Sequence, residues 1–268
     1  MSVPPVVPGS YTKEKSRRWS PWKQIRAFRS VVRRRLASQD AGAMTVLEHL
    51  EDLRIRLLKI LVSIAVMTAV SFYYSGALVN FLAAPVGGRE ELVSIDVTEN
   101  IGVFMRVSLL GGITLGFPFL LYQIVAFASP GLEKRERRWL YILIPSATVL
   151  FFLGVGFAWF IMVPAALQFL LNFLGILTTP RSSTYFSFVT SFLFWVGISF
   201  EMPLVIFFLA KLKVVTAGQL LRGWRYAVMA VAALAAIVTP TIDPVNMMIV
   251  AVPLFALYLI GILLAWFA

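Results

Sequence analysis

The sequence predicts an all-α, polytopic membrane protein with six transmembrane helices. Hydrophobic residues make up 59% of the 268 residues, which is more than a soluble domain of this size needs for its core. They are gathered into long blocks, and most blocks reach the roughly 20 residues that cross a bilayer as a helix. We expect crossings at residues 57–78, 101–128, 140–163, 186–210, 226–238 and 245–267.

The distribution of basic residues orients these crossings. On a six-span path, 21 of the 24 lysines and arginines flank one face of the membrane, and only Arg89, Arg106 and Arg181 remain for the other. In membrane proteins the cytoplasmic segments carry the excess of lysine and arginine. We therefore expect both ends of the chain in the cytoplasm.

Residues 1–43 are a polar, basic segment that we expect to form a cytoplasmic tail, ahead of a membrane domain at residues 44–268. Apolar residues recur every three or four positions from Trp19 to Leu36, which suits a basic helix lying on the lipid surface. A disordered tail and an organellar transit peptide are the alternatives. The net charge of +11 lies beside the crossings, so it indicates attraction to anionic lipids and not a nucleic-acid partner.

Two apolar segments, residues 165–177 and 226–238, have only 13 residues each. Their length alone does not decide which of them crosses the membrane. Each would span about 20 Å as a helix, against a hydrocarbon core of about 30 Å. Charge decides between them, because the basic cluster at 211–225 stays inside only if residues 165–177 do not cross, and residues 226–238 must then cross. We expect an interfacial helix behind Pro164, with its leucines on one apolar face, and a fifth crossing that starts early from a capping box at Thr216 and Gln219.

Carboxylates are expected at the cytoplasmic end of the first crossing. Glu48, Asp52 and Arg56 follow one another at intervals of four, which places them along one helix face. A structural salt bridge between Asp52 and Arg56 is the alternative to a binding role. His49 has no partner histidine or cysteine and is expected to be a surface residue, so no metal site or cofactor is predicted.

The second cytoplasmic segment offers a further acid. Glu133 and Arg137 can pair four residues apart, which leaves Glu136 less committed beside four basic residues. Because guanidinium groups meet carboxylates in a bidentate manner, Glu136 is a candidate docking point for an incoming pair of cations. A solvated loop without such a role is the alternative.

Glu201 is the most informative single residue, because it lies about two-thirds of the way along the fourth crossing. A charged group inside a span costs about 2.5 to 3.5 kcal/mol, so such an acid pairs, takes up a proton or serves a function. Pro203 cannot donate to the Ser199 carbonyl, so the helix is expected to open there. Gly197, one turn earlier, allows another helix to approach closely.

From residue 44 onward the chain closely resembles the TatC family, the multispanning receptor subunits of the twin-arginine protein translocase. The motifs that carry the resemblance stand in the family's order along the chain. They are His-Leu-Glu-Asp-Leu-Arg-Ile-Arg-Leu at 49–57, Ala84-Pro85, Phe117-Pro118-Phe119 with Tyr122-Gln123, Ala-Phe-Ala-Ser-Pro-Gly-Leu at 126–132, Glu136-Arg137-Arg138, Ser-Phe-Glu-Met-Pro at 199–203, and Thr239-Pro240 with Asp243-Pro244.

The resemblance implies six spans in a curved, cup-like bundle and a role in protein transport. Members bind the paired arginines in signal peptides of folded precursors, recruit single-span TatA and TatB-type subunits, and assemble with further copies of themselves. Transport is driven by the proton-motive force. The expected location is a bacterial plasma membrane, with a thylakoid or other organellar membrane as the alternative.

The resemblance also implies the roles of particular residues. Signal-peptide binding falls to Asp52 and Glu136, helped by Arg54 and Phe127, with Glu51 beside Asp52 as a competing contact. Glu201 matches a membrane-embedded glutamate that faces the partner helix. Asn246 stands next to Met247, where the family often has a glutamine, and is a candidate for a further polar contact with partner subunits. The matching outer-side positions are Pro85, Arg106 and Asp243.

An intramembrane protease and an ion-coupled secondary transporter are the alternatives to this interpretation. An intramembrane protease needs a histidine or paired metal ligands within the membrane, and the sole histidine is at the inner surface, so an enzyme is not expected. An ion-coupled secondary transporter that uses Glu201 is the stronger alternative, because a buried acid beside a proline-broken helix suits ion coupling. It predicts similar halves, and the sequence has no internal repeat.

Overall fold

The computed structural model describes residues 46–131, 134–172, 179–239 and 244–268. The chain divides into two units, Met1–Glu48 and His49–Ala268, and the elements considered below lie in the second unit except for residues 46–48. The tail predicted at residues 1–43 lies outside the described residues.

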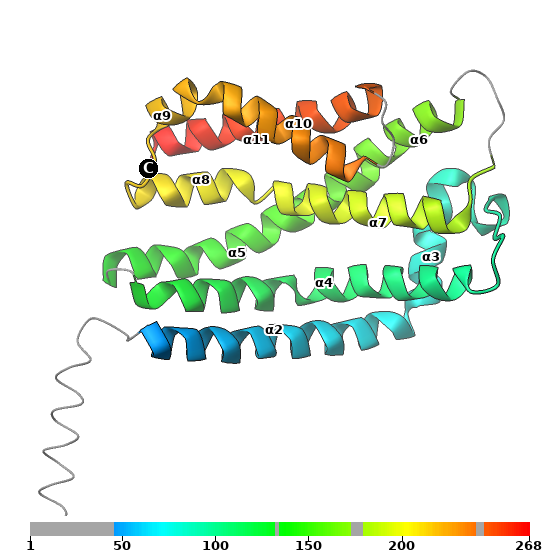
Figure 1. Ribbon diagram of the computed structural model, residues 1–268, viewed down its shortest axis with the longest axis horizontal. Coiled ribbons are helices and arrows are strands. Elements are labelled where there is room, and N and C mark those ends of the chain that lie inside the picture. The colour runs from blue at the N-terminus through cyan, green and yellow to red at the C-terminus, as the bar shows by residue number, and fades with distance from the viewer. Residues whose placement is uncertain (1–45, 132–133, 173–178, 240–243) are drawn as a thin grey trace, which may run out of the picture. The chain divides into compact units, whose positions relative to one another are not determined.

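The described chain is helical, with one isolated bridge between Val93 and Arg181, which confirms the all-α class. Figure 1 shows the long helices running roughly along one another, and α3 running across them. They are α2 (Val46–Tyr73), α3 (Ser75–Ala83), α4 (Glu99–Ala128), α5 (Lys134–Phe157), α6 (Val163–Asn172), α7 (Ser182–Ser199), α8 (Met202–Lys211), α9 (Ala217–Arg222), α10 (Trp224–Val238) and α11 (Pro244–Trp266).

Within the described ranges, five stretches of helix are long and apolar enough to cross a membrane, so the chain is a polytopic membrane protein. The helix α10 has only 15 residues, or about 22 Å, and falls below this length. The five stretches are Glu48–Tyr73, Glu99–Ala128, Tyr141–Asn172, Ser182–Lys211 and Pro244–Trp266.

The first expected crossing ends earlier than its apolar block. Helix α2 stops at Tyr73, five residues before the predicted end of the crossing at Leu78. A new helix, α3, begins at Ser75 and continues past Leu78. Tyr74 leaves the helical region of backbone conformation, and the Ser75 hydroxyl donates to the Phe72 carbonyl at 2.7 Å. This local side-chain bond stabilises the turn, so an unbroken apolar run was not enough to predict a single helix.

The prediction of a separate interfacial helix at residues 165–177 was wrong in two respects. Helix α5 continues into α6 without a break, through a π-helical segment at Ala158–Met162. The wider π turn precedes Pro164 and accommodates its ring, so the proline does not end the helix. The expected lipid-facing leucines pack on the protein core instead: Leu167 is buried, and Leu170 and Leu171 are half-buried against it.

The capping box predicted before the fifth crossing is confirmed, although the helix it opens is short. The Gln219 amide donates to the Thr216 hydroxyl at 3.3 Å, and the Gln219 side chain accepts from the Thr216 amide at 2.9 Å. The resulting helix, α9, ends at Arg222, and α10 begins at Trp224 after Gly223. A glycine weakens a helix, so the chain bends between α9 and α10.

The break expected in the fourth crossing is present. Helix α7 ends at Ser199 and α8 begins at Met202, with Glu201 as the residue that precedes α8. The Ser199 hydroxyl turns back to the Trp195 carbonyl at 2.7 Å. The missing donor of Pro203 and this competing hydroxyl bond together explain why the apolar run divides into two helices.

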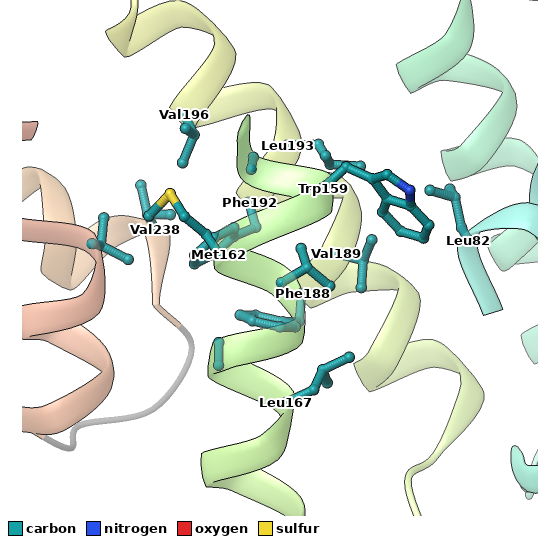
Figure 2. Close-up of a cluster of buried hydrophobic side chains, with 14 of the residues drawn as sticks. Leu82, Trp159, Met162, Leu167, Phe188, Val189, Phe192, Leu193, Val196 and Val238 are labelled. Carbon is teal, nitrogen blue, oxygen red and sulfur yellow. The ribbon is translucent and has the colours of Figure 1, made fainter. Parts of the chain in front are cut away.

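The main hydrophobic core lies between the α5–α6 helix and α7, and it extends to α3, α10 and α11. Figure 2 shows Trp159, Met162 and Leu167 meeting a row of side chains from α7, including Phe192 and Val189. Gly197 lies against Phe151 and Val155 of α5, as expected for close helix packing. This packing holds α7, and therefore the break before Glu201, in a fixed position.

Helices α8 and α11 run in the same direction. Helix α10, which lies between them in the sequence, runs in the opposite direction. Lys211 at the end of α8 donates from Nζ to the carbonyl oxygen of Ala268, just beyond the end of α11, at 2.8 Å. Figure 1 shows the C-terminus beside the end of α8, on the side where α4 ends and α5 begins. The chain must therefore travel to the opposite end between α8 and α11, and α10 supplies that path.

Candidate functional site

The first candidate site is a polar cluster where α2 and α4 come together. The Arg56 Nε donates to Asp52 Oδ2 at 2.7 Å, and the Arg56 Nη1 lies 3.5 Å from Oε1 of Gln123 on α4. The side chains of Asp52 and Arg56 are 23% and 22% exposed, so water reaches both of them. The predicted salt bridge is therefore real, and it also orients the carboxylate toward α4.

An aromatic contact closes the cluster on one side. The rings of His49 and Phe127 are stacked, with centroids 4.3 Å apart and planes 18° apart. Both residues are half-buried. His49 thus packs on an aromatic ring, and the described residues contain no group of three or more acidic, histidine or cysteine side chains that could hold a metal.

The structure brings some of the expected signal-peptide residues together. Asp52 and Phe127 lie on the facing helices, whereas Glu51 and Arg54 are exposed on other faces of α2. The backbone of Glu136 lies in the first turn of α5, shortly after α4 ends, so it is at the same end of the bundle. Its side chain lies outside the described part of the chain.

The second candidate site is Glu201 at the break between α7 and α8. It is ten residues from the end of α8, or about 15 Å, which is about half of a 30 Å hydrocarbon core. Its Oε1 atom is buried and has no hydrogen-bond partner among the described residues. A buried acceptor without a partner is costly, so the Glu201 carboxyl would be stabilised by any hydrogen-bond donor brought to it.

Comparison with known proteins identifies the family. Residues 48–253 match the family described as Sec-independent protein translocase protein (TatC). The chain is 34% identical to the protein of that name from Deinococcus radiodurans, over 85% of this chain and 88% of that protein. The chain belongs to the TatC family.

Further relatives and solved structures agree with this membership. The chloroplastic TATC protein of Arabidopsis thaliana is 36% identical, over 85% of this chain and 67% of that protein. Two crystal structures titled as the twin-arginine translocase receptor TatC have TM-scores of 0.73 and 0.75, at 34% and 32% identity. The two matches cover 81% of this chain, and they cover 98% and 99% of the respective solved chains. TatC membership favours a transport component over an enzyme or an ion-coupled transporter.

The other expected partner contact, Asn246, is not part of the Glu201 site. It lies in the first turn of α11 and is only 2% exposed. Glu201 instead is near the other end of α11, where Gly261 meets Pro203 and Ile206. Gly261 is 15 positions after Asn246, or about 22 Å along the helix. In this TatC protein Asn246 is therefore a core residue remote from Glu201.

The outer-side residues named by the TatC resemblance take different positions. Pro85 is half-buried in the short helical turn Ala84–Val86 after α3. Arg106 is exposed on α4, two turns after its start. Asp243 lies outside the described residues.

One buried ionic site of this TatC chain was missed by the sequence interpretation. Glu99, whose side chain is 1% exposed, lies 3.1 Å from the Arg181 Nε and accepts the Ser183 amide at 2.6 Å and the Ile95 amide at 3.1 Å. It joins the start of α4 to the start of α7, 82 residues further along the chain. In the sequence, this site was indicated only by Arg181, one of the three basic residues expected on the outer side. Spacing could not predict that Glu99 is its partner.

Proposed function

We propose that this chain is the receptor subunit of a twin-arginine translocase and binds the signal peptides of folded precursor proteins. The observation that carries the proposal is the Asp52 carboxylate, held by Arg56 beside α4. Among the residues that the structure describes, Arg56 bonds to the Oδ2 atom and none bonds to Oδ1, which supports Oδ1 as the acceptor for an incoming guanidinium. Phe127 and the backbone of Glu136 lie at the same end of the bundle, which supports Glu136 as the acid for the second arginine.

The proposed topology has six crossings, with both ends in the cytoplasm and residues 1–43 as a basic tail at that surface. The shared direction of α8 and α11 supports α10 as the fifth crossing, despite its length. A bilayer that thins around α10 accommodates a helix of about 22 Å. The basic residues near Lys211 and Arg225 then remain on the cytoplasmic side.

The receptor proposal predicts that the chain distinguishes arginine from lysine. The purified full chain in lipid nanodiscs is titrated with a fluorescent twin-arginine signal peptide and with its twin-lysine version. We expect the twin-lysine peptide to bind about tenfold more weakly, because an ammonium group lacks the planar, pre-organised array of donors of a guanidinium and is more strongly hydrated. Equal affinities for the two peptides would remove the receptor function.

We further propose that Glu201 is the contact for single-span subunits of the TatA and TatB type. Its buried Oε1 atom, halfway through the membrane, suits a hydrogen-bond donor on a neighbouring helix. The assembly contains further copies of this chain. We place it in a bacterial plasma membrane, with a thylakoid membrane as the alternative because a chloroplastic relative is 36% identical.

Replacing Glu201 tests this contact separately from peptide binding. Glu201→Ala is expected to reduce co-purification of the single-span subunits at least severalfold, since one interhelical hydrogen bond in a membrane is worth about 1 kcal/mol. Glu201→Gln keeps a polar side chain of the same size and is the matched control, expected to retain most of the assembly. Both variants should bind the twin-arginine peptide normally, and loss of peptide binding in either would contradict the division of roles.

A further inference from the structure

A polar groove lies where α4, α7 and the end of α10 meet. It has a volume of about 500 Å³ and lies at the end of the bundle where α4 and α7 begin, which is the outer side in the proposed topology. Five of its eight lining residues are polar. The lining residues used below are Arg106, Thr184, Ser187, Ser191 and Ile237.

The groove exists because α10 is short. Helix α10 ends at Val238, which lines the groove, so it does not cover the first turns of α7. Ser183, Ser187 and Ser191 follow at intervals of four and therefore share one face of α7. Ser187 and Ser191 donate no hydrogen bond from their hydroxyls to any described residue, so their donors remain available.

The charge of the groove is positive. Arg106 is exposed and forms no ion pair with any residue in the described ranges. The nearest acid on α4, Glu99, is fully engaged by Arg181 and by backbone amides. Its negative charge is therefore balanced locally, and the Arg106 guanidinium is left as the uncompensated charge.

We propose that this groove binds the phosphate of a membrane phospholipid, with Arg106 as the cation and the α7 hydroxyls as additional donors. Arg106 is seven residues after the start of α4, or about 10 Å into the helix, near the boundary between headgroups and hydrocarbon. Guanidinium and hydroxyl donors facing lipid tails would be unsatisfied at that depth, whereas a phosphate diester accepts from several of them.

An apolar side chain beside the polar residues of the groove favours a lipid over a free phosphate ion as the ligand. Ile237 is 67% exposed at the rim and offers an apolar surface directly beside the polar wall. A glycerol backbone and acyl chains fit this surface, whereas an inorganic phosphate ion gains nothing from it. The groove thus matches both halves of a phospholipid.

Native mass spectrometry of the full chain, released from detergent with added phosphatidylglycerol, tests the proposal. Arg106→Gln is expected to weaken retention of one lipid about tenfold, the effect of losing a charge-assisted hydrogen bond. A Ser187→Ala and Ser191→Ala double variant should show a smaller loss. Arg89→Gln is the matched control, because it removes the same charge on the same side but outside the groove, where Arg89 lies over Phe104.

Competing occupants are separated by the choice of probe. Diacylglycerol, which lacks the phosphate, should not be retained, and millimolar inorganic phosphate should not displace the lipid. Equal lipid retention by the native chain and Arg106→Gln, retention of diacylglycerol, or displacement by phosphate would each overturn the proposal. The measurement needs no signal peptide, so its failure leaves the receptor function untouched.

Discussion

Replacing Asp52 with asparagine is expected to weaken binding of a twin-arginine peptide by about ten- to a hundredfold. A hydrogen bond to a charged partner contributes about 1.5 to 3 kcal/mol, and the variant removes the charge while keeping the shape. The fold should survive, because the pair with Arg56 is partly exposed and worth about 0.5 kcal/mol. Fluorescence anisotropy of the labelled peptide with the chain in nanodiscs measures the change.

Glu51→Gln is the control for Asp52→Asn. Glu51 is the adjacent acid, but it is exposed on another face of α2, so its removal should change the peptide affinity less than twofold. Glu136→Gln is expected to act in the same direction as Asp52→Asn, since two arginines need two acids. A larger loss of affinity from Glu51→Gln than from Asp52→Asn would show that Glu51, and not Asp52, contacts the peptide.

Replacing Gly112 with alanine is expected to lower the free energy of unfolding by about 1 to 3 kcal/mol, the usual effect of overpacking. A methyl group at Gly112 would lie 2.6 Å from the backbone nitrogen and Cα of Thr68 on α2, and it would also meet the Thr68 hydroxyl. Backbone atoms cannot move aside as a side chain can. Helix α2 is the most exposed of the five long apolar stretches, so it has few other contacts to hold it.

Gly102→Ala is the matched control because it makes the same change in the same helix. A methyl group there meets no heavy atom within 4 Å, and alanine favours a helix over glycine by about 1 kcal/mol. The unfolding midpoint in detergent, followed by circular dichroism, should fall for Gly112→Ala and stay or rise for Gly102→Ala. Equal midpoints for the two variants would show that α2 does not depend on this contact.

Features that depend on spacing within one helix were predictable from the sequence. The apolar blocks predicted the helices, the capping box at Thr216 was found where expected, and the pair of Asp52 with Arg56 followed from an interval of four. The break before Glu201 followed from the missing donor of Pro203. Each of these rests on bonds between neighbours in the chain, so the local sequence contains the information.

Only the tertiary structure decided which distant groups meet. It joined Glu99 to Arg181 across 82 residues, separated Asn246 from the region of Glu201 by about 22 Å along α11, and placed the leucines after Pro164 on the core. It also gave α10 its direction through the contact of Lys211 with Ala268. Such contacts depend on how whole helices pack, and an apolar residue that suits lipid suits a helix interface equally well, so composition and periodicity cannot distinguish the two.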